Sequence, residues 1–515
     1  MSIVKVRDYN DLKQITPIKK SIFELGLIMM VVIGLSSCHN KKAGDTAKPL
    51  RPNLLVIQSD EHNFRTLGCY REYLDHDQAW IWGESNNVET PNIDYLADNG
   101  MLFTKFYAST PVCSPSRASF ISGLYPHHAG VPANDQPMYD SVITSAWVLS
   151  QNDYKTGFIG KWHLDGKAKP GWEPERDFGF TDNRYMFNRG HWKKLEDTDK
   201  GPAVAARNEN DIPTYNLDSA DSCSFTTDFL TNRALDFITE NKEEPFFLYL
   251  SYPDPHGPDR VRTPYDNMYT NMEYQAPGTY NVKKEDAPAW AKPDKKAGID
   301  QSQYFGMVKC IDDNVGRVIE HLKNKGLLDN TIIVFTSDHG DLRAEHHRHN
   351  KGNPFEASAK VPFIVHYPKE IPSGKVIGKA FSTVDFSPTI LSYLGQEVPG
   401  QMQGRDFSEL LNNPEKQDKW EDIVFSRASG KKKEGNWIAA ISSRYKLVLG
   451  KNEKTWLFDT REDPDELINF IDDPEKADVV HELAKRLYDY SVEFSDPYLT
   501  GTAMGEKLKS LLETY

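Results

Sequence analysis

The first 400 residues of the chain contain short hydrophobic segments that alternate with longer amphipathic ones. The segments at 54–57, 246–250 and 332–335 consist entirely of Leu, Ile, Val, Phe and Tyr. Apolar runs of this length predict strands that are buried on both faces of a sheet. Residues 304–325 carry apolar side chains at helical spacing, and 227–241 also predict a helix. Strands that alternate with helices indicate an α/β fold, with a large mixed, mostly parallel β-sheet flanked by helices.

Less regular stretches separate these elements. The further predictions in this part of the chain are a helix at 92–99, strands at 102–107 and 158–160, and a helix after a loop that contains Cys113. Residues 165–225 are rich in Gly, Pro, Asp and aromatic residues, and 258–298 are irregular as well. Such stretches predict loops, and long loops beside a sheet favour a binding or catalytic site.

The pattern changes after about residue 400. Short hydrophobic segments follow one another closely at 423–425, 437–441, 445–449 and 455–458, and a predicted helix covers 477–494. Closely spaced strands with turns between them predict a small C-terminal antiparallel sheet, here with a helix on it. Since 515 residues exceed one ordinary compact core, we predict an N-terminal domain at 52–400 and a C-terminal subdomain at 401–515.

The first 51 residues have the pattern of an export signal followed by a tether. Two lysines precede an apolar run at 25–35, which is too short to span a bilayer and suits the core of a signal peptide. Small residues then lead to Cys38, and this arrangement resembles the bacterial lipoprotein box. We expect residues 1–38 to be a lipoprotein-type signal, Cys38 to carry a lipid anchor to the membrane, and residues 39–51 to form a polar tether.

The residues after Cys38 bear on where the anchored protein would be retained. They lack the acidic run that resembles the surface-export tag of some Gram-negative lipoproteins. We therefore expect a periplasmic, membrane-anchored lipoprotein of a Gram-negative bacterium. The alternative is a poorly ordered tail with an incidental cysteine.

Charge and cysteine usage exclude two other classes of protein. The formal net charge of −14 argues against binding of nucleic acid through a general basic surface. An anionic substrate would instead need a local basic pocket. The five cysteines are scattered and form no CxxC pair, so a zinc ribbon is a poor interpretation.

Two of the predicted strands end in residues that bind cations. One runs into Asp60 and Glu61, and the other, far along the chain, runs into Asp338 and His339. In open α/β sheets, ligands bind just beyond the carboxyl ends of the strands. If these two strands are neighbours, their end residues form a site for a hard cation, because oxygen ligands favour Ca²⁺ or Mg²⁺ over zinc. The alternative is that each group only caps its strand.

Cys113 opens the pentapeptide Cys-Ser-Pro-Ser-Arg, which ends at Arg117. Cys-x-Pro-x-Arg is the signature of the type I sulfatase family in the alkaline phosphatase-like superfamily, and the chain resembles bacterial carbohydrate sulfatases of that family along nearly its whole mature length. The wider signature departs mildly, because Ile-Ser-Gly stands at 121–123 where Leu-Thr-Gly is usual. The other motifs follow in the family's order: Asp60, Gly160–His163, Pro255–Pro258, Ser337–Gly340 and Lys351.

The resemblance implies a modified residue, a metal and a catalytic set. In the family a dedicated maturation enzyme oxidises the signature cysteine to formylglycine, so Cys113 would be the nucleophile precursor and a formylglycine-generating enzyme would be a partner. The positions implied to hold Ca²⁺ are Asp60, Glu61, Cys113, Asp338 and His339. Two of them depart from the commonest pattern: Glu61 stands where Asp or Gln is more usual, and His339 where many members have Asn. Whether Glu61 binds the metal directly or through water is left open.

The implied catalytic residues are Cys113, Arg117, Lys161, His163, His256 and Lys351. A hydrated aldehyde offers one oxygen to attack sulfur and a second hydroxyl that later expels sulfate. The resemblance gives Arg117, Lys161 and Lys351 the task of surrounding the sulfate with positive charge. It makes His256 the first choice of general acid and Lys351 the second, while Asp338 would assist deprotonation of the nucleophile and His163 would hold its hydroxyl.

Two further segments suggest what lies beyond the sulfate. Residues 343–349 are basic and either face a sugar or form a solvated loop, and residues 189–192 supply a cation, an imidazole and a ring that suit carbohydrate. The first hypothesis is therefore hydrolysis of sulfate esters on sulfated glycan or glycosaminoglycan fragments. A phosphodiesterase or phosphonate monoester hydrolase of the same superfamily is the second, and an inactive glycan-binding protein is the third.

Overall fold

The computed structural model describes residues 51–283, 286–291, 293, 298–431 and 435–514. The predicted signal, Cys38 and nearly all of the tether lie outside the described residues. Residues 50–515 form one compact unit, and the boundary predicted near residue 400 stays a prediction. Among the described residues, no helix is both long enough and apolar enough to cross a membrane.

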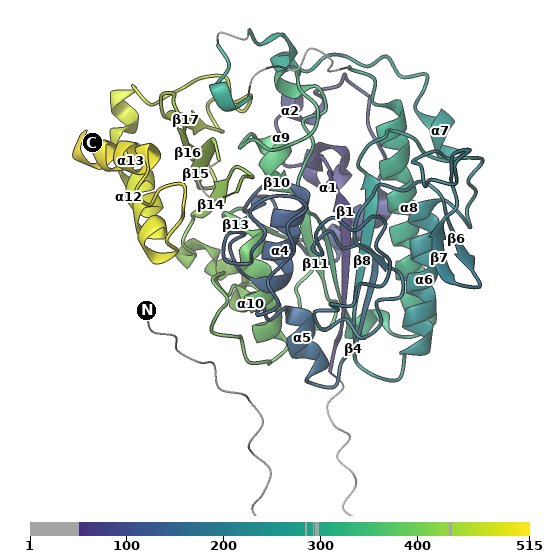
Figure 1. Cartoon of the computed structure of the whole chain (residues 1–515). Coiled ribbons are helices and arrows are strands. Elements are labelled where there is room, and N and C mark those ends of the chain that lie inside the picture. The colour runs from purple at the N-terminus through teal and green to yellow at the C-terminus, as the bar shows by residue number, and fades with distance from the viewer. Residues whose placement is uncertain (1–50, 284–285, 292, 294–297, 432–434, 515) are drawn as a thin grey trace, which may run out of the picture. The chain divides into compact units, whose positions relative to one another are not determined.

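The predicted α/β fold is confirmed, and its centre is an eight-stranded mixed sheet (Figure 1). Its strands β9, β1, β8, β4 and β5 are parallel neighbours, whereas β11 runs antiparallel to β9 and β2. In spatial order the strands are β12 (Lys375–Ile377), β2 (Met101–Phe103), β11 (Phe363–His366), β9 (Thr331–Ser337), β1 (Asn53–Asp60), β8 (Phe246–Pro255), β4 (Lys155–Lys161) and β5 (Met186–Phe187).

Alternate residues of β1 face opposite layers of helices (Figure 1). Leu54 and Val56 pack in the core that α4 (Cys113–Ser122), α5 (Ser145–Ser150) and α10 (Phe386–Tyr393) close. Leu55 and Ile57 pack in the core closed by α3 (Pro91–Asp98), α6 (Thr226–Glu240) and α8 (Ser302–Asn324). Each such side chain contributes about 1.5–3 kcal/mol through burial, so the unbroken apolar run of the sequence follows from a strand covered on both faces.

The small C-terminal antiparallel sheet is also confirmed. Its strands β14 (Val424–Arg427), β15 (Trp437–Ile441), β16 (Tyr445–Gly450) and β17 (Trp456–Asp459) pair in chain order. Helices α12 (Ala477–Glu493) and α13 (Ala503–Thr514) belong to the same hydrophobic core, at the yellow end of the chain in Figure 1. The Trp437 indole donates a hydrogen bond to the Gly352 carbonyl, so this sheet contacts the segment just after Lys351.

Three local predictions differ from the structure. The strand expected at 102–107 is two strands, because the chain turns at Thr104 and places β3 (Phe106–Tyr107) in a separate three-stranded sheet with β10 (Lys360–Val361) and β13 (Phe381–Ser382). Cys113 is the first residue of α4 and does not lie in a preceding loop. The stretch 165–225 contains β5 and the hairpin of β6 (Leu195–Thr198) and β7 (Gly201–Val204), whose four-residue strands leave no periodic signal.

The remaining α-helices among the described residues are short. They are α1 (Gly68–Arg71), α2 (His76–Ala79), α7 (Tyr265–Met268), α9 (Glu356–Ala359) and α11 (Ser408–Asn412).

Candidate functional site

The two acidic strand ends meet at one edge of the central sheet. Strands β1 and β9 are parallel neighbours with Ser59 opposite Ser337, which meets the condition set above, so Asp60 and Asp338 leave the sheet side by side. The Glu61 backbone N–H donates to Asp338 Oδ1 at 3.1 Å. Glu61 itself has a left-handed backbone, with φ of 64°, which is uncommon for a residue with a side chain. Parallel register therefore builds this half of the site, and a strained turn re-aims the residue that follows Asp60.

Helix α4 adds a thiol and a guanidinium to these acids. Cys113 and Arg117 lie one helical turn apart, so both face the strand ends. The Arg117 guanidinium donates to Asp338 Oδ2 at 2.8 Å and to Asp60 Oδ2 at 3.0 Å. Cys113 Sγ lies 3.2 Å from His339 Nε2 and 3.7 Å from Asp60 Oδ1. All of these side chains are buried, so the guanidinium compensates two carboxylates that could not remain charged alone.

Four of the predicted metal positions converge. One ligand atom each from Asp60, Cys113, Asp338 and His339 lies within 4.8 Å of the other three. Glu61 is not in this group of four, but its buried Oε1 has no hydrogen-bond partner among the described residues. Two converging carboxylates beside an unpartnered carboxylate oxygen fit a hard cation. Direct binding by Glu61 stays a prediction.

A second group of side chains lies on the other side of Glu61. Lys351 Nζ is 2.7 Å from Glu61 Oε2 and 2.7 Å from His256 Nε2, and His256 Nε2 is 2.8 Å from the same carboxylate oxygen. Lys161 Nζ donates to Asp60 Oδ2 and lies 2.8 Å from His191 Nε2. We call the whole set the catalytic cluster: Asp60, Glu61, Cys113, Arg117, Lys161, His191, His256, Asp338, His339 and Lys351.

The electrostatics of the catalytic cluster favour a negative charge at Cys113. Burial and Asp60 raise the pKa of the Cys113 thiol, but Lys161, Lys351 and His339 outweigh them and hold it well below its ordinary value. Burial lowers the pKa of Lys351, but Cys113 and Glu61 raise it by more than burial lowers it. The net pKa is above the ordinary value, so this ammonium stays charged. A field that favours a thiolate at this position also favours an anionic oxygen there.

His163 is buried but is not joined to Cys113 by any recorded contact within the described chain. Its Nε2 lies 3.5 Å from Asp135 Oδ1, and its Nδ1 has no partner among the described side chains. The role implied for His163 stays a prediction.

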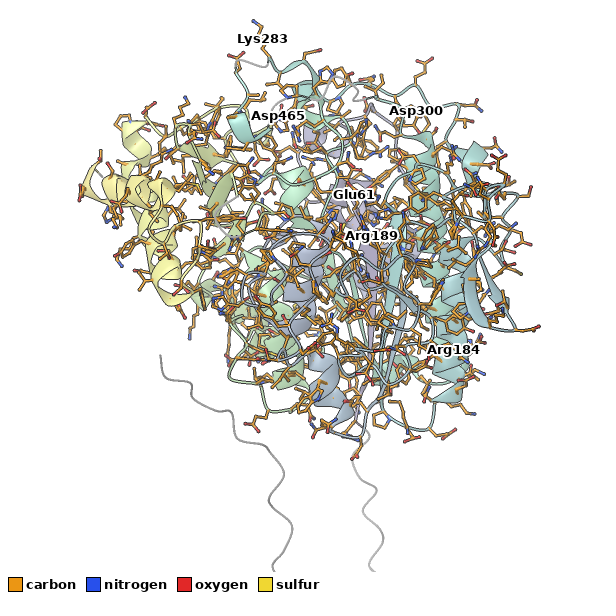
Figure 2. All side chains as sticks on the ribbon, in the orientation of Figure 1. Glu61, Arg184, Arg189, Lys283, Asp300 and Asp465 are labelled. Carbon is orange, nitrogen blue, oxygen red and sulfur yellow. The ribbon has the colours of Figure 1, made fainter. Side chains whose placement is uncertain are left out.

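The segment 189–192 contributes differently from what its composition suggests. His191 belongs to the catalytic cluster, where its ring stacks on that of His256. Trp192 is buried in the core and offers no face to a ligand. Arg189, marked with Glu61 in Figure 2, remains 38% exposed and pairs with Asp135 at 3.2 Å.

In the basic stretch 343–349, Arg343 and His346 fit neither interpretation, since they are buried and so belong neither to a sugar-facing surface nor to a solvated loop. Arg343 is buried and pairs with Asp259 at 2.8 Å and with Asp341 at 3.5 Å. His346 is buried as well, and its ring stacks on Phe355 at 3.6 Å. Both residues therefore stabilise the fold, because their charge or ring is already matched inside the protein.

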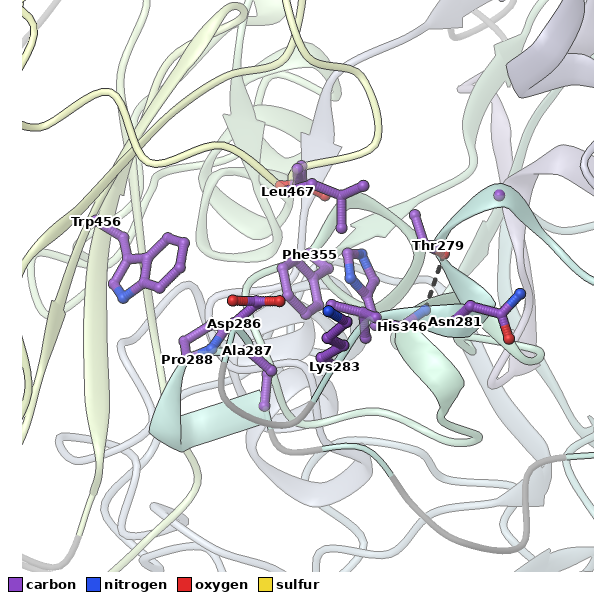
Figure 3. A pocket seen from close by; sticks show the side chains of 14 residues that line it. Thr279, Asn281, Lys283, Asp286, Ala287, Pro288, His346, Phe355, Trp456 and Leu467 are labelled. Atoms are coloured by element: carbon purple, nitrogen blue, oxygen red, sulfur yellow. Dashed lines mark hydrogen bonds between the residues drawn. The ribbon is translucent and has the colours of Figure 1, made fainter.

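A separate cavity of about 320 Å³ lies beside this stretch (Figure 3). Thr279, His346, Phe355, Trp456 and Leu467 are among its lining residues, and no member of the catalytic cluster lines it. The cavity is therefore distinct from the candidate active site.

Three contacts of the site had no signal in the sequence. Ser251 Oγ lies 2.7 Å from Arg117 Nη1 and 2.7 Å from the Lys161 carbonyl oxygen. Lys193 is buried against Asp254, just before His256. These residues belong to no motif, and only the tertiary structure brings them to the motif residues.

Comparisons with known proteins agree with this geometry. The family model "Sulfatase" matches residues 52–396, and the model "N-sulphoglucosamine sulphohydrolase, C-terminal" matches 344–493. An N-acetylglucosamine-6-O-sulfatase of Bacteroides thetaiotaomicron is 26% identical, covering 91% of this chain and 91% of its own length. An ulvan-active sulfatase of Formosa agariphila is 25% identical, covering 92% of this chain and 88% of the relative.

Solved structures show the same fold. A protein in complex with D-glucosamine-2-N,6-O-disulfate superposes with a TM-score of 0.70 at 21% identity, covering 87% of this chain and 100% of that one. A phosphonate monoester hydrolase from Silicibacter pomeroyi superposes with a TM-score of 0.66 at 21% identity, covering 87% of this chain and 97% of that one.

Proposed function

Because the chain belongs to the sulfatase family, whose members are sulfuric ester hydrolases, we propose that it hydrolyses sulfate esters on carbohydrates. The observation that carries the proposal is the position of Cys113, at the start of α4 and among the buried Asp60, Asp338 and His339. The named activities of the N-acetylglucosamine-6-O-sulfatase and ulvan-active relatives support a sulfated glycan as substrate.

We further propose that Cys113 is converted to formylglycine by a maturation enzyme and that Asp60, Asp338 and His339, with Glu61 beside them, hold Ca²⁺. Formylglycine supplies an oxygen nucleophile in place of a thiol, and Ca²⁺ supplies positive charge at the sulfate oxygens. Burial lowers the pKa of His339 but Asp338 raises it, and the net result is about 9. A bound cation would replace that proton, since metal ligands must be deprotonated.

The protein's own cations would bind the sulfate. Lys161 and Lys351 both act on Cys113 with their positive charge, because each lowers the pKa of its thiol. Arg117 is committed to Asp60 and Asp338, so its main task is to hold those two carboxylates in place. Fixed charges in a buried site stabilise developing negative charge without reorganisation.

Proton transfer would use the groups around Glu61 and Asp338. His256 and Lys351 share Glu61 Oε2, so a proton lost by one can be replaced from the other. His256 is our choice of donor to the leaving alkoxide, with Lys351 second. Burial and Asp60 raise the pKa of Asp338, which suits a group that accepts the proton of the nucleophile.

The test is coexpression with a formylglycine-generating enzyme, followed by mass spectrometry of the Cys113 peptide and assays of sulfate and phosphate release. We expect sulfate release from sulfated sugars by the wild type, its loss in Cys113→Ala, and no loss in Cys223→Ala, which removes an exposed cysteine. Phosphate release without sulfate release would favour the phosphodiesterase or phosphonate monoester hydrolase hypothesis. A modified, folded protein inactive on every ester would favour the glycan-binding one.

We also propose that the protein is a lipoprotein anchored through Cys38 in the periplasm. The sequence around Cys38 supports this proposal. Metabolic labelling with a fatty acid should mark the wild type and not Cys38→Ala, and protease treatment of intact cells should leave a periplasmic protein uncut. Equal labelling of the two forms would contradict the proposal.

A further inference from the structure

A segment outside every sulfatase motif reaches into the catalytic cluster. Residues 188–194 connect β5 to β6, and His191 lies at their centre. His191 Nε2 is 2.8 Å from Lys161 Nζ. The same ring stacks on His256, with 3.5 Å between the ring centroids and 9° between the planes. One imidazole therefore contacts two of the residues to which the reaction is assigned.

A buried ion pair holds this segment in place. Lys193 is fully buried, and its Nζ lies 2.5 Å from Asp254 Oδ1 and 3.1 Å from the His256 carbonyl oxygen. Thr227 Oγ1 donates to the other oxygen of Asp254 at 2.6 Å. Because Asp254 lies at the end of β8 and His256 directly follows this strand, the ion pair sets the distance between the backbones of the segment and of His256. The contacts of Lys193 with Asp254 and with the His256 carbonyl thus hold the His191 ring against the His256 ring.

The contacts of Lys161 fix the orientation of its ammonium group. An ammonium group has three donors. Asp60 accepts one and His191 Nε2 accepts the second, and the described part of the chain supplies no third acceptor. With two of its three donors fixed, the ammonium can rotate little, and the third donor keeps one direction.

We infer that His191 is a positioning residue of the active centre: its Nε2 orients the Lys161 ammonium, and its ring sets the plane of His256. The inference goes beyond the proposed function and depends on it only for the kinetic readout. His191 acts through Lys161 and His256 and is not itself required to touch the sulfate.

Three substitutions separate the two contacts. His191→Gln keeps an acceptor near Nε2 and removes the ring, His191→Phe keeps the ring and removes the acceptor, and His191→Ala removes both. We expect Phe and Ala to lower kcat by about tenfold to a hundredfold with KM little changed, since misplacement of a catalytic group by about 1 Å costs about that much. We expect Gln to recover part of the kcat lost in Ala, because Gln restores an acceptor for Lys161 but not the ring that stacks on His256. The same substitutions at His76, which is 65% exposed, are the controls and should leave kcat and KM unchanged.

A crystal structure of His191→Phe tests the inference independently of activity. We expect Lys161 Nζ to leave the position between Asp60 and the ring at 191, and to return there in His191→Gln. Wild-type kcat in the folded Phe variant, or a Gln variant as impaired as Ala, would overturn the inference. If the wild type releases no sulfate, the proposed function fails, and an unmoved Lys161 in the Phe crystal would still overturn the positioning role.

Discussion

Two clusters of charged residues in this protein use the same kinds of residue. They differ in whether every buried carboxylate oxygen has a hydrogen-bond or ion-pair partner. The interface cluster, between the central and C-terminal sheets, consists of Lys105, Glu356, Lys360, Lys446 and Glu466. Both Glu356 oxygens have partners, because Lys446 and the Tyr107 hydroxyl bind one, and Lys105 and Lys360 bind the other. Both Glu466 oxygens also have partners, the Lys446 ammonium and the Glu356 backbone N–H.

The catalytic cluster is incomplete by comparison. Glu61 Oε1 is buried without a partner among the described residues, whereas both oxygens of Glu356 and both of Glu466 have one. A fully paired buried network stabilises and specifies a fold, whereas unpaired polar atoms in a buried network indicate a ligand that the protein leaves room for. Burial of charge by itself therefore does not distinguish a ligand-binding site from a structural cluster, but the pairing of the carboxylate oxygens does.

The largest expected effect comes from removing an ammonium from the catalytic cluster. Lys351→Met should lower kcat by about 10²- to 10⁴-fold, because it removes a charge from the proposed sulfate site and a partner of His256, the proposed general acid. Steady-state kinetics on a sulfated sugar and a thermal melt measure the two consequences. A kcat within threefold of wild type would contradict the assignment of Lys351 to the reaction.

The same substitution in the interface cluster should act on stability instead. Lys446→Met removes the ammonium shared by Glu356 and Glu466 and should cost about 3–5 kcal/mol in the free energy of unfolding, with kcat per folded molecule unchanged. Urea denaturation and active-site-normalised kinetics provide the check. If Lys446→Met and Lys351→Met had the same profile, the distinction between the clusters would be lost.

Glu345 tests a buried carboxyl group that belongs to neither cluster. Burial raises its pKa to about 7 although Arg65 lowers it. Between pH 4.5 and 7 the unfolded chain loses this proton while the folded protein keeps it, so stability falls as the pH rises toward 7. Relative to Glu345→Gln, the wild type should lose about 3 kcal/mol of unfolding free energy between pH 4 and 8. A pH-independent difference between the two proteins in urea melts would be the contrary result.

Metal binding should give the smallest of these effects on stability. At a Ca²⁺ concentration one hundred times its Kd, the free energy of unfolding should rise by about 2.7 kcal/mol. Asp60→Asn should abolish this rise and Glu466→Gln should retain it, because only Asp60 belongs to the converging ligands. Calorimetry with chelator and with added Ca²⁺ is the measurement, and a rise that survives in Asp60→Asn would place the cation elsewhere.

Much of the scaffold was predictable because its signals are local. An apolar run such as 54–57 predicts a strand buried on both faces, whatever surrounds it. The closely spaced hydrophobic segments after residue 420 predicted the antiparallel sheet. The turn at Thr104 was not predictable, since the hydrogen bond from its backbone N–H goes to Ile377, which is distant in the sequence. Strands β6 and β7 were missed for a different reason: they pair with each other as a local hairpin, but four residues each, without alternation, leave no periodic signal.

The sequence by itself determined the two strands that carry Asp60 and Asp338 at their ends, and the parallel pairing of these strands brings the two carboxylates together. Only the tertiary structure decided how those residues are paired. It directed the Glu61 carboxylate toward Lys351 and His256, paired the buried Arg343 with two acids, and brought His191 onto Lys161. Hydrophobic periodicity places a backbone, whereas the partner of a charge depends on distances of a few ångströms that loops and side-chain packing set together.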